Sequence, residues 1–290
     1  MTSEPSRRRF AEELRDRKGL RSKALVEALA SVPRERFVGP GPWLILSARE
    51  GGYTSSPNAD PAHLYEDVPV ALDAARLLNN GAPGLMAPVL DLLAPAPGEH
   101  LVHVGCGTGY YTALLAELVG RTGHVLALEL EPEFAARAKE NLRNYPQVEV
   151  VRADGTRHDV GKPHAILVSA GATHPRLQWL DALPVGGRLV VPLTAVAAPG
   201  QMARFGRNLA GMVCLVNRKE MGYEARFVER IGVSFCHGAR DPRHERLLRE
   251  AYLRGGTNLV ASLRREPHAA DMTCWLHGDG FCLSTRALSA

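Results

Sequence analysis

The chain has 290 residues, of which 45% are hydrophobic and 23% are charged, so it is long enough and apolar enough to bury a sizeable core. The formal net charge of +4 is too small to argue for a nucleic-acid partner. No stretch approaches the roughly 20 apolar residues that span a bilayer, so we expect no membrane partner. Residues 1–21 are polar and arginine-rich, which does not fit a secretory signal. The five scattered cysteines favour a reducing, cytoplasmic location over a disulfide framework.

The beginning of the chain is expected to be helical and then irregular. Apolar residues recur at helical spacing over residues 8–17 and 21–30, with Gly19 between the two segments. Residues 39–61 are rich in Gly, Pro and Ser, and Gly51-Gly52 breaks any periodicity. We therefore predict two helices followed by a long surface loop, a kind of segment that is often functional.

Strands and helices alternate from residue 98 onward. Helices are predicted over residues 110–119 and 133–144, and two antiparallel strands over residues 212–217 and 225–235. Short apolar runs predict five buried strands, at residues 100–104, 124–129, 148–152, 165–169 and 188–193. This alternation predicts an α/β fold with a Rossmann-like, doubly wound, mostly parallel sheet that an antiparallel hairpin closes.

The end of the chain predicts a helix and a further hairpin. Asp241 followed by Pro242 marks a helix start, and the turn His277-Gly278-Asp279-Gly280 lies between two apolar runs. We expect three parts: an N-terminal helical and substrate-loop region at residues 1–95, a cofactor-binding core at 96–238, and a C-terminal extension at 239–290.

Three residues of this extension are potential zinc ligands. They are Cys274, His277 and Cys282. Their spacing matches no standard Cys/His pattern and no fourth ligand is evident. The sequence therefore assigns no metal site.

The strongest motif is a glycine loop, placed where a strand turns into a helix. Glycines there let the backbone turn sharply and approach a ligand closely. Glu129 ends the next strand, about 20 residues after the loop, where an acidic side chain meets ribose hydroxyls. Asp154 follows the third strand, at the height of an adenine ring. These features predict a nucleoside-containing cofactor, held by Gly105, Cys106, Gly107, Thr108, Gly109, Glu129, Leu130, Asp154 and Gly155.

The spacing within the loop separates two classes of cofactor. A loop that binds the pyrophosphate of NAD or FAD favours G-x-G-x-x-G. This chain instead has G-C-G-T-G followed by two tyrosines, which resembles the loop of class I methyltransferases. We expect S-adenosylmethionine (SAM) as the cofactor and S-adenosyl-L-homocysteine as its product. A dinucleotide, or a glycine turn without a ligand, is the alternative.

Several further segments, in the same order, resemble the protein-L-isoaspartate O-methyltransferase family. The resemblance covers about residues 20–235 and implies methyl transfer from SAM to a carboxylate of a peptide or protein. It depends on the cofactor motifs together with Val32 to Val38, Tyr65-Glu66-Asp67, Gly186 to Pro192 and Val233-Ser234-Phe235.

The substrate segment of that family departs from its pattern in this chain. The family has a Thr-Ile-Ser-x-Pro-like segment that touches the substrate carboxylate. Its counterpart here is Asn79-Asn80-Gly81-Ala82-Pro83, in which amides and a glycine replace the hydroxyls. The loop at residues 39–61 is also longer than the family's, and the chain continues beyond Cys236.

The chemistry implied by the resemblance needs little acid–base catalysis. A carboxylate has a pKa of about 4 and is already ionised at neutral pH. The enzyme mainly has to align oxygen, methyl carbon and sulfur and to exclude water. Asn79, Asn80 and Ser169 are our candidates for orienting the carboxylate. An alcohol or phenol would need a general base instead, for which the candidates are His63, His164 and His174.

The departures lead to the functional prediction. We predict a SAM-dependent carboxyl O-methyltransferase with a dedicated peptide substrate, as in relatives that tailor ribosomally made peptides. The alternatives are repair of L-isoaspartate in proteins, O-methylation of a small molecule, and a protein that binds SAM without turnover. The sequence leaves the oligomeric state open.

Overall fold

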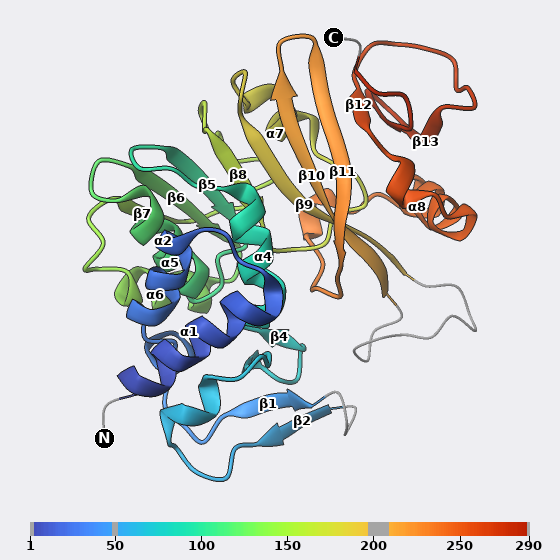
Figure 1. The fold of residues 1–290 in the computed structure, drawn as a ribbon. Helices are drawn as coiled ribbons and strands as arrows, with labels where there is room; N and C mark the ends of the chain where they lie inside the picture. The colour runs from blue at the N-terminus through green and yellow to red at the C-terminus, as the bar shows by residue number, and fades with distance from the viewer. Residues whose placement is uncertain (1–2, 48–51, 197–208, 289–290) are drawn as a thin grey trace. The chain divides into compact units, whose positions relative to one another are not determined.

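The computed structural model describes residues 3–47, 52–196 and 209–288, and the chain forms two compact units, residues 1–153 and 154–290 (Figure 1). The three-part organisation expected from the sequence stays a prediction. Among the helices within the described ranges, none is both long and apolar enough to cross a lipid bilayer.

Two helices open the first unit, as predicted. They are α1 (Glu4–Lys18) and α2 (Lys23–Ser31). Gly19 ends α1 in the left-handed conformation, with φ of 64°, which glycine adopts without the steric cost that a side chain adds. The hydroxyl of Ser22 accepts a hydrogen bond from the Leu25 backbone N–H at 3.1 Å and so begins α2. The short helix α3 (Glu35–Val38) follows.

The predicted loop at residues 39–61 is in part regular structure. It contains two antiparallel strands, β1 (Leu44–Ser47) and β2 (Gly52–Ser55), whereas Gly51 lies outside the described residues. The prediction was wrong here because the strands are only four residues long and are surrounded by turn residues. Apolar side chains anchor them: Trp43 is 5% exposed, and Ile45 packs on the cluster of Val38, Trp43, Leu64 and Val70.

The remaining elements of the first unit include the first predicted strands of the core. β5 (His100–Val104), β6 (His124–Glu129) and β7 (Val148–Arg152) are parallel and adjacent in that order. The helices α5 (Tyr110–Val119) and α6 (Pro132–Asn141) connect them. Before them come the 3-10 turn η1 (Pro61–Leu64), the strand pair β3 (Ala71–Asp73) and β4 (Leu78–Asn79), and helix α4 (Pro83–Leu93).

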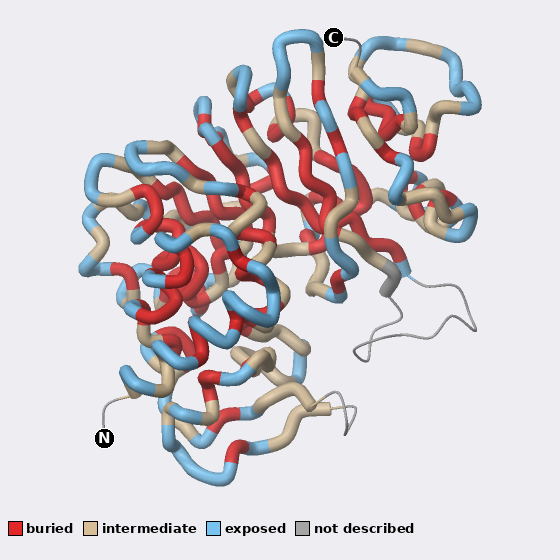
Figure 2. The backbone as a smooth tube through the Cα atoms, in the orientation of Figure 1, coloured by how far each residue is buried: buried red, intermediate tan, exposed pale blue. Residues whose placement is uncertain are grey.

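The second unit is a seven-stranded arrangement with α7 (Leu177–Ala182) after its first strand. β8 and β9 are parallel, and all later neighbours are antiparallel. In spatial order the strands are β8 (Ala165–Val168), β9 (Arg188–Val196), β10 (Leu209–Lys219), β11 (Gly222–Arg230), β12 (Ser262–Arg264), β14 (Phe281–Ser284) and β13 (Cys274–Gly278). Buried residues follow β8 and β9 along most of their length and occupy the middle of β10 (Figure 2).

The tail pairs with the strands of the second unit. Helix α8 (Pro242–Arg254) begins as predicted, because the Asp241 carboxylate accepts a hydrogen bond from the His244 backbone N–H at 2.8 Å. The 3-10 turns η2 (His237–Ala239) and η3 (Thr257–Leu259) flank it. The predicted hairpin is β13–β14, and β12 pairs with β11 through Tyr223 opposite Leu263. The tail therefore extends the sheet by three strands.

Candidate active site

The glycine loop occupies the five residues between β5 and α5. Gly105, Gly107 and Gly109 have φ of 75°, 58° and 98°, in the left-handed region that favours glycine. A Cβ at Gly109 would lie only 2.7 Å from Cδ1 of Leu142. Backbone conformation and close packing therefore both require glycine at position 109, and the loop can approach a ligand with bare backbone.

Glu129 connects the end of β6 to this loop. Its Oε2 accepts a hydrogen bond from the Gly107 backbone N–H at 2.7 Å, and its Oε1 accepts one from the Glu131 N–H at 2.9 Å. The residue is 7% exposed, and this burial raises the pKa of the carboxyl group, although the backbone donors oppose the rise. A carboxylate accepts about four hydrogen bonds, so acceptor positions remain for ribose hydroxyls.

The other loop residues offer different surfaces. Leu130, directly after Glu129, is 43% exposed and gives an apolar face of the kind that an adenine ring packs on. Cys106 is buried, and burial together with the nearby Glu129 raises the pKa of its thiol, so the side chain is a neutral packing group. Thr108 Oγ1 is buried and has no hydrogen-bond partner among the described residues, which leaves a polar atom for a ligand.

The segment Asn79–Pro83 lies against the helix that follows the glycine loop. A Cβ at Gly81 would be 3.3 Å from the Tyr111 ring of α5, and a Cβ at Gly107 would be 3.6 Å from Leu72 of β3. At the far end of the β3–β4 pair, Arg76 forms an ion pair of 2.5 Å with Glu131, just beyond β6. The structure thus brings together the predicted substrate segment and the predicted cofactor loop.

Both asparagines of this segment have structural contacts. Asn79 Oδ1 accepts a hydrogen bond from the Gly81 N–H at 2.9 Å, and Asn79 Nδ2 donates to the Tyr53 hydroxyl at 3.2 Å. Asn80 is buried, and its Oδ1 accepts a hydrogen bond from Arg34 Nε at 3.0 Å. Among the residues with described positions, the Asn80 Nδ2 group has no partner, so it remains a donor for a substrate.

Arg34 organises this region, although no role was predicted for it from the sequence. It is 0% exposed, yet its guanidinium is satisfied by neutral oxygens. Besides Asn80, it donates to the backbone carbonyls of Leu64 at 2.9 Å, Val68 at 2.8 Å and Gly81 at 2.8 Å. The motif Val32 to Val38 contains this arginine, but the acceptors that would reveal its role lie far away in the sequence.

The Tyr65-Glu66-Asp67 motif also supports the scaffold. The Tyr65 hydroxyl accepts a hydrogen bond from the Arg34 N–H at 3.2 Å and donates to the Glu35 carboxylate. Asp67 Oδ1 accepts a hydrogen bond from the Gly84 N–H at 2.6 Å, in the first turn of α4. Tyr65 therefore fixes the backbone at Arg34, and Asp67 fixes the backbone directly after the substrate segment.

The predicted residues of the second unit are placed as follows. Asp154 Oδ1 accepts hydrogen bonds from the Thr156 N–H at 2.9 Å and the Thr156 hydroxyl at 2.7 Å. The Gly155 carbonyl accepts one from Trp179 Nε1 at 2.9 Å. Ser169 directly follows β8 and is half-buried. The roles proposed for these residues stay predictions.

The histidines considered as general bases have other surroundings. His174 packs against the imidazole of His244, with ring centroids 4.5 Å apart, and against Phe281. Burial and the neighbouring His244 lower its pKa to about 4. His63 is in hydrogen-bond contact with Asn58, and His164 is exposed. His174 thus belongs to the packing of the tail.

Residues 6–228 match the model of the family described as protein-L-isoaspartate(D-aspartate) O-methyltransferase. The chain belongs to this family. Among its relatives, the protein-L-isoaspartate O-methyltransferase of Aeropyrum pernix is 37% identical over 196 residues, which cover 65% of this chain and 66% of that protein. The enzyme of the same name from Methanopyrus kandleri is 34% identical over 193 residues, 65% of this chain and 76% of that protein.

Solved structures with the same fold agree with the family assignment. A structure named protein-L-isoaspartate O-methyltransferase has a TM-score of 0.63 and 22% identity, over 79% of this chain and 65% of that one. A second, from Plasmodium falciparum and in complex with S-adenosyl-L-homocysteine, has a TM-score of 0.60 and 17% identity, over 79% of this chain and 97% of that one. The expected Rossmann-like methyltransferase fold and SAM as the cofactor of this O-methyltransferase family are confirmed.

The family match ends before the C-terminal extension. This chain spans about two thirds of the Aeropyrum pernix protein, and the family model ends at residue 228. Helix α8 and the strands β12, β13 and β14 therefore lie outside the family match.

Proposed function

We propose that this protein transfers the methyl group of SAM to the free carboxylate of an isoaspartyl residue in a peptide or protein. The observation that carries the proposal is the family match over residues 6–228, which includes both the glycine loop and the segment held by Arg34. The dedicated peptide substrate favoured by the sequence analysis has less support, because the relatives are named for isoaspartate.

The residues of the first unit suit this reaction. SAM carries its methyl group on a sulfonium, and the neutral thioether that remains after methyl transfer is a good leaving group. Glu129 and the glycine loop would hold the nucleoside, since the loop offers bare backbone and the carboxylate has acceptor positions left. The substrate carboxylate is ionised at neutral pH and needs no base, so correct alignment is the main requirement.

Asn80 is the residue that would orient the carboxylate. Arg34 Nε holds its Oδ1 at 3.0 Å, which fixes the direction of the amide plane, and its Nδ2 is left without a partner in the described part of the chain. A substrate carboxylate would accept a hydrogen bond from this donor. Specificity would follow if binding excludes water from it, because a substrate that lacks the acceptor would then leave the donor unpaired.

The test uses two peptides that differ only in one linkage. Methyl-labelled SAM is incubated with the protein and an isoaspartyl peptide, or with the same peptide containing ordinary aspartate. We expect label on the isoaspartyl peptide and release of methanol at mild alkaline pH, because a methyl ester is base-labile. Label that resists alkali, or equal labelling of both peptides, contradicts the proposal.

The dedicated peptide substrate remains a second candidate on one specific observation. The Asn79-Asn80-Gly81 segment lacks the two hydroxyls of the family pattern, and its amides already bind Tyr53, Gly81 and Arg34. A substrate with different groups around its carboxylate would suit such a site. Poor turnover of several isoaspartyl peptides, combined with normal SAM binding, would favour this candidate over general repair.

A further inference from the structure

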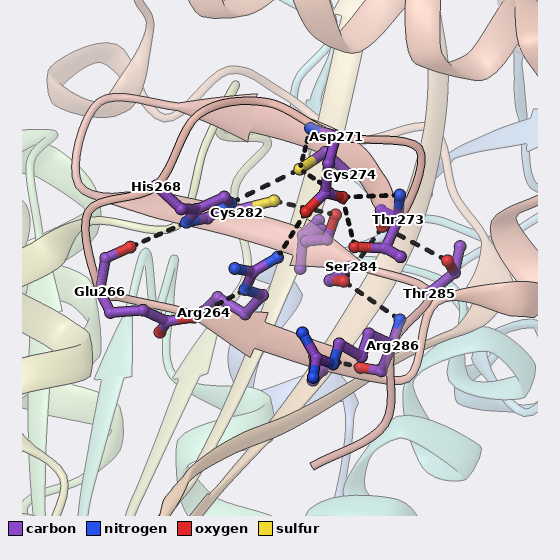
Figure 3. Close-up of polar contacts among 12 residues, drawn as sticks. Arg264, Glu266, His268, Asp271, Thr273, Cys274, Cys282, Ser284, Thr285 and Arg286 are labelled. Carbon is purple, nitrogen blue, oxygen red and sulfur yellow. Dashed lines mark hydrogen bonds and ion pairs between the residues drawn. The ribbon is translucent and has the colours of Figure 1, made fainter. Parts of the chain in front are cut away.

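Two histidines and two cysteines converge in the C-terminal extension. One ligand atom from each of His268, Cys274, His277 and Cys282 lies within 4.8 Å of the ligand atoms of the other three. Figure 3 shows His268, Cys274 and Cys282 directed toward one another across the β13–β14 hairpin and the segment before it. We call these four residues the His2Cys2 cluster. It lies outside the residues that match the family model.

The hairpin register explains how three of the four side chains meet. His277 of β13 is directly opposite Cys282 of β14, so their side chains share one face of the sheet. Cys274 is three residues before His277, and in a regular strand that odd spacing places two side chains on opposite faces. The register shifts between Cys274 and Leu276, however. This bulge resets the alternation and returns Cys274 to the face of His277.

The bulge is visible in the burial of β13. Trp275 and Leu276 are consecutive and both buried, whereas Cys274 and His277 on either side of them are half-buried. Two neighbouring inward residues are incompatible with regular alternation. The strand thus departs from its period at the place that brings the two ligands together.

His268 is the fourth member, and it comes from the segment between β12 and β13. Its Nδ1 lies 2.8 Å from the Glu266 carbonyl oxygen, to which a protonated Nδ1 donates. Its Nε2 lies 3.5 Å from Cys274 Sγ. Metal-binding histidines commonly show this division, in which one nitrogen donates to a carbonyl and the other faces the metal.

Asp271 holds the Cys274 side chain in place. Its backbone N–H donates to Cys274 Sγ at 3.3 Å, a contact that a metal-bound sulfur could also accept. The Cys274 thiol donates to the Asp271 carboxylate Oδ1 at 3.5 Å, and that oxygen also accepts hydrogen bonds from the Thr273 N–H at 2.7 Å and the Thr273 hydroxyl at 2.6 Å. Arg264 adds an ion pair of 3.5 Å to Asp271.

Packing alone does not account for the cluster. His277 Nδ1 is buried and has no hydrogen-bond partner among the described residues, and Cys282 is fully buried beside it. All five cysteines are free thiols. A buried polar nitrogen without a partner costs free energy and calls for an explanation such as a bound ion.

We propose that His268, Cys274, His277 and Cys282 bind one structural Zn²⁺ ion in a tetrahedral site. With Zn–S near 2.3 Å and Zn–N near 2.0 Å, ligand atoms of such a site are about 3.3–3.8 Å apart, a range that the 3.5 Å between His268 and Cys274 matches. Two thiolates and two neutral imidazoles balance the ionic charge, and each thiol releases one proton on binding. Four protein ligands leave no open position, so the site is structural.

A metal ion at this site would stabilise the C-terminal extension. Residues 265–273 form no helix or strand, and β13 is the edge strand of its sheet. An ion bound by His268 of this segment, by Cys274 and His277 of β13 and by Cys282 of β14 would cross-link the segment to both strands of the hairpin. Small extensions with little core of their own are commonly stabilised by such a metal.

The experiment measures zinc in the full-length protein. After expression with zinc and dialysis, we expect about one zinc ion per chain, and Co²⁺ replacement should give the absorption of a tetrahedral thiolate site. His268→Ala and Cys274→Ala should lose most of this metal. Cys214→Ala, which changes a buried cysteine of β10 outside the cluster, is the matched control and should retain it.

Thermal unfolding gives an independent readout. A chelator should lower the Tm of the wild-type protein and of Cys214→Ala, but should leave the Tm of His268→Ala unchanged. His268 is only half-buried, so this variant should fold even if a Cys282 variant does not. A metal-free wild type, equal zinc in His268→Ala, or a disulfide between Cys274 and Cys282 in the purified protein would overturn the proposal.

Discussion

The carboxylate of Glu129 accepts a hydrogen bond of 2.7 Å from the Gly107 backbone N–H, which joins the end of β6 to the glycine loop. One side chain thereby shapes the loop and presents its remaining acceptor positions at the proposed ribose site. We therefore expect cofactor binding and loop geometry to be coupled through this residue.

Replacing Glu129 should weaken SAM binding. Glu129→Ala removes a charged acceptor and releases Gly107, so we expect a loss of about 1.5–3 kcal/mol, or about 10- to 150-fold in Kd. Isothermal titration calorimetry with SAM and S-adenosylhomocysteine measures it. Glu133→Gln, an exposed change in the first turn of α6, serves as the control and should bind normally. Unchanged affinity in Glu129→Ala would show that the ribose binds elsewhere.

The affinity for SAM should also depend on pH through Glu129. Burial raises the pKa of this carboxyl group, so on acidification it becomes protonated at a higher pH than an ordinary glutamate. Protonation removes acceptor capacity, and Kd should rise as the pH falls through the raised pKa. Titrations between pH 7 and 5 would measure this. The weaker-binding Glu129→Gln variant should show a flatter dependence, and an equal slope in both proteins would assign the effect to another group.

Arg34 should matter for both stability and substrate turnover. Arg34→Met leaves four acceptors, two buried and two partly buried, without their donor, and we expect a loss on the order of 3 kcal/mol in the free energy of unfolding. Urea denaturation measures this loss. Arg36→Met changes an exposed arginine of the same motif and should unfold like wild type.

Arg34→Lys separates stability from turnover. Lysine keeps the charge but cannot place its donors in the planar fork that reaches Asn80, Val68 and Gly81. We expect the peptide-methylation rate to fall more than the affinity for SAM, because Asn80 would lose its fixed orientation. Equal losses in both measurements would mean that Arg34 acts only on the cofactor loop.

The buried His103 should make stability depend on pH. Burial lowers its pKa to about 3, whereas an unfolded histidine titrates near 6.5. Below about pH 6.5 the unfolded chain binds a proton that the folded protein excludes, so this contribution to stability is complete above that pH and is lost as the pH falls toward 3. The Tm of His103→Leu relative to wild type should therefore improve on acidification.

Local patterns in the sequence were sufficient for the core fold and the cofactor loop. The strands β5, β6 and β7 are short apolar runs, and the turns between them carry glycine, proline or acidic signals within a few residues. The start of α8 was equally local, because Asp241 caps a backbone N–H only three residues later. Such features depend on neighbours along the chain, which a sequence displays directly.

Tertiary structure alone decided the contacts between distant segments. In the sequence, nothing distinguishes Arg34 from other charged residues. In the structure, it donates hydrogen bonds to the carbonyls of Leu64, Val68 and Gly81. His268 lies in a segment without periodicity, and the odd spacing of Cys274 and His277 places them on opposite faces of a regular strand. The bulge at Trp275 and the pairing of β13 with β14 reverse that expectation. The register between strands is set by packing across the sheet, so it cannot be predicted from the periodicity of one strand.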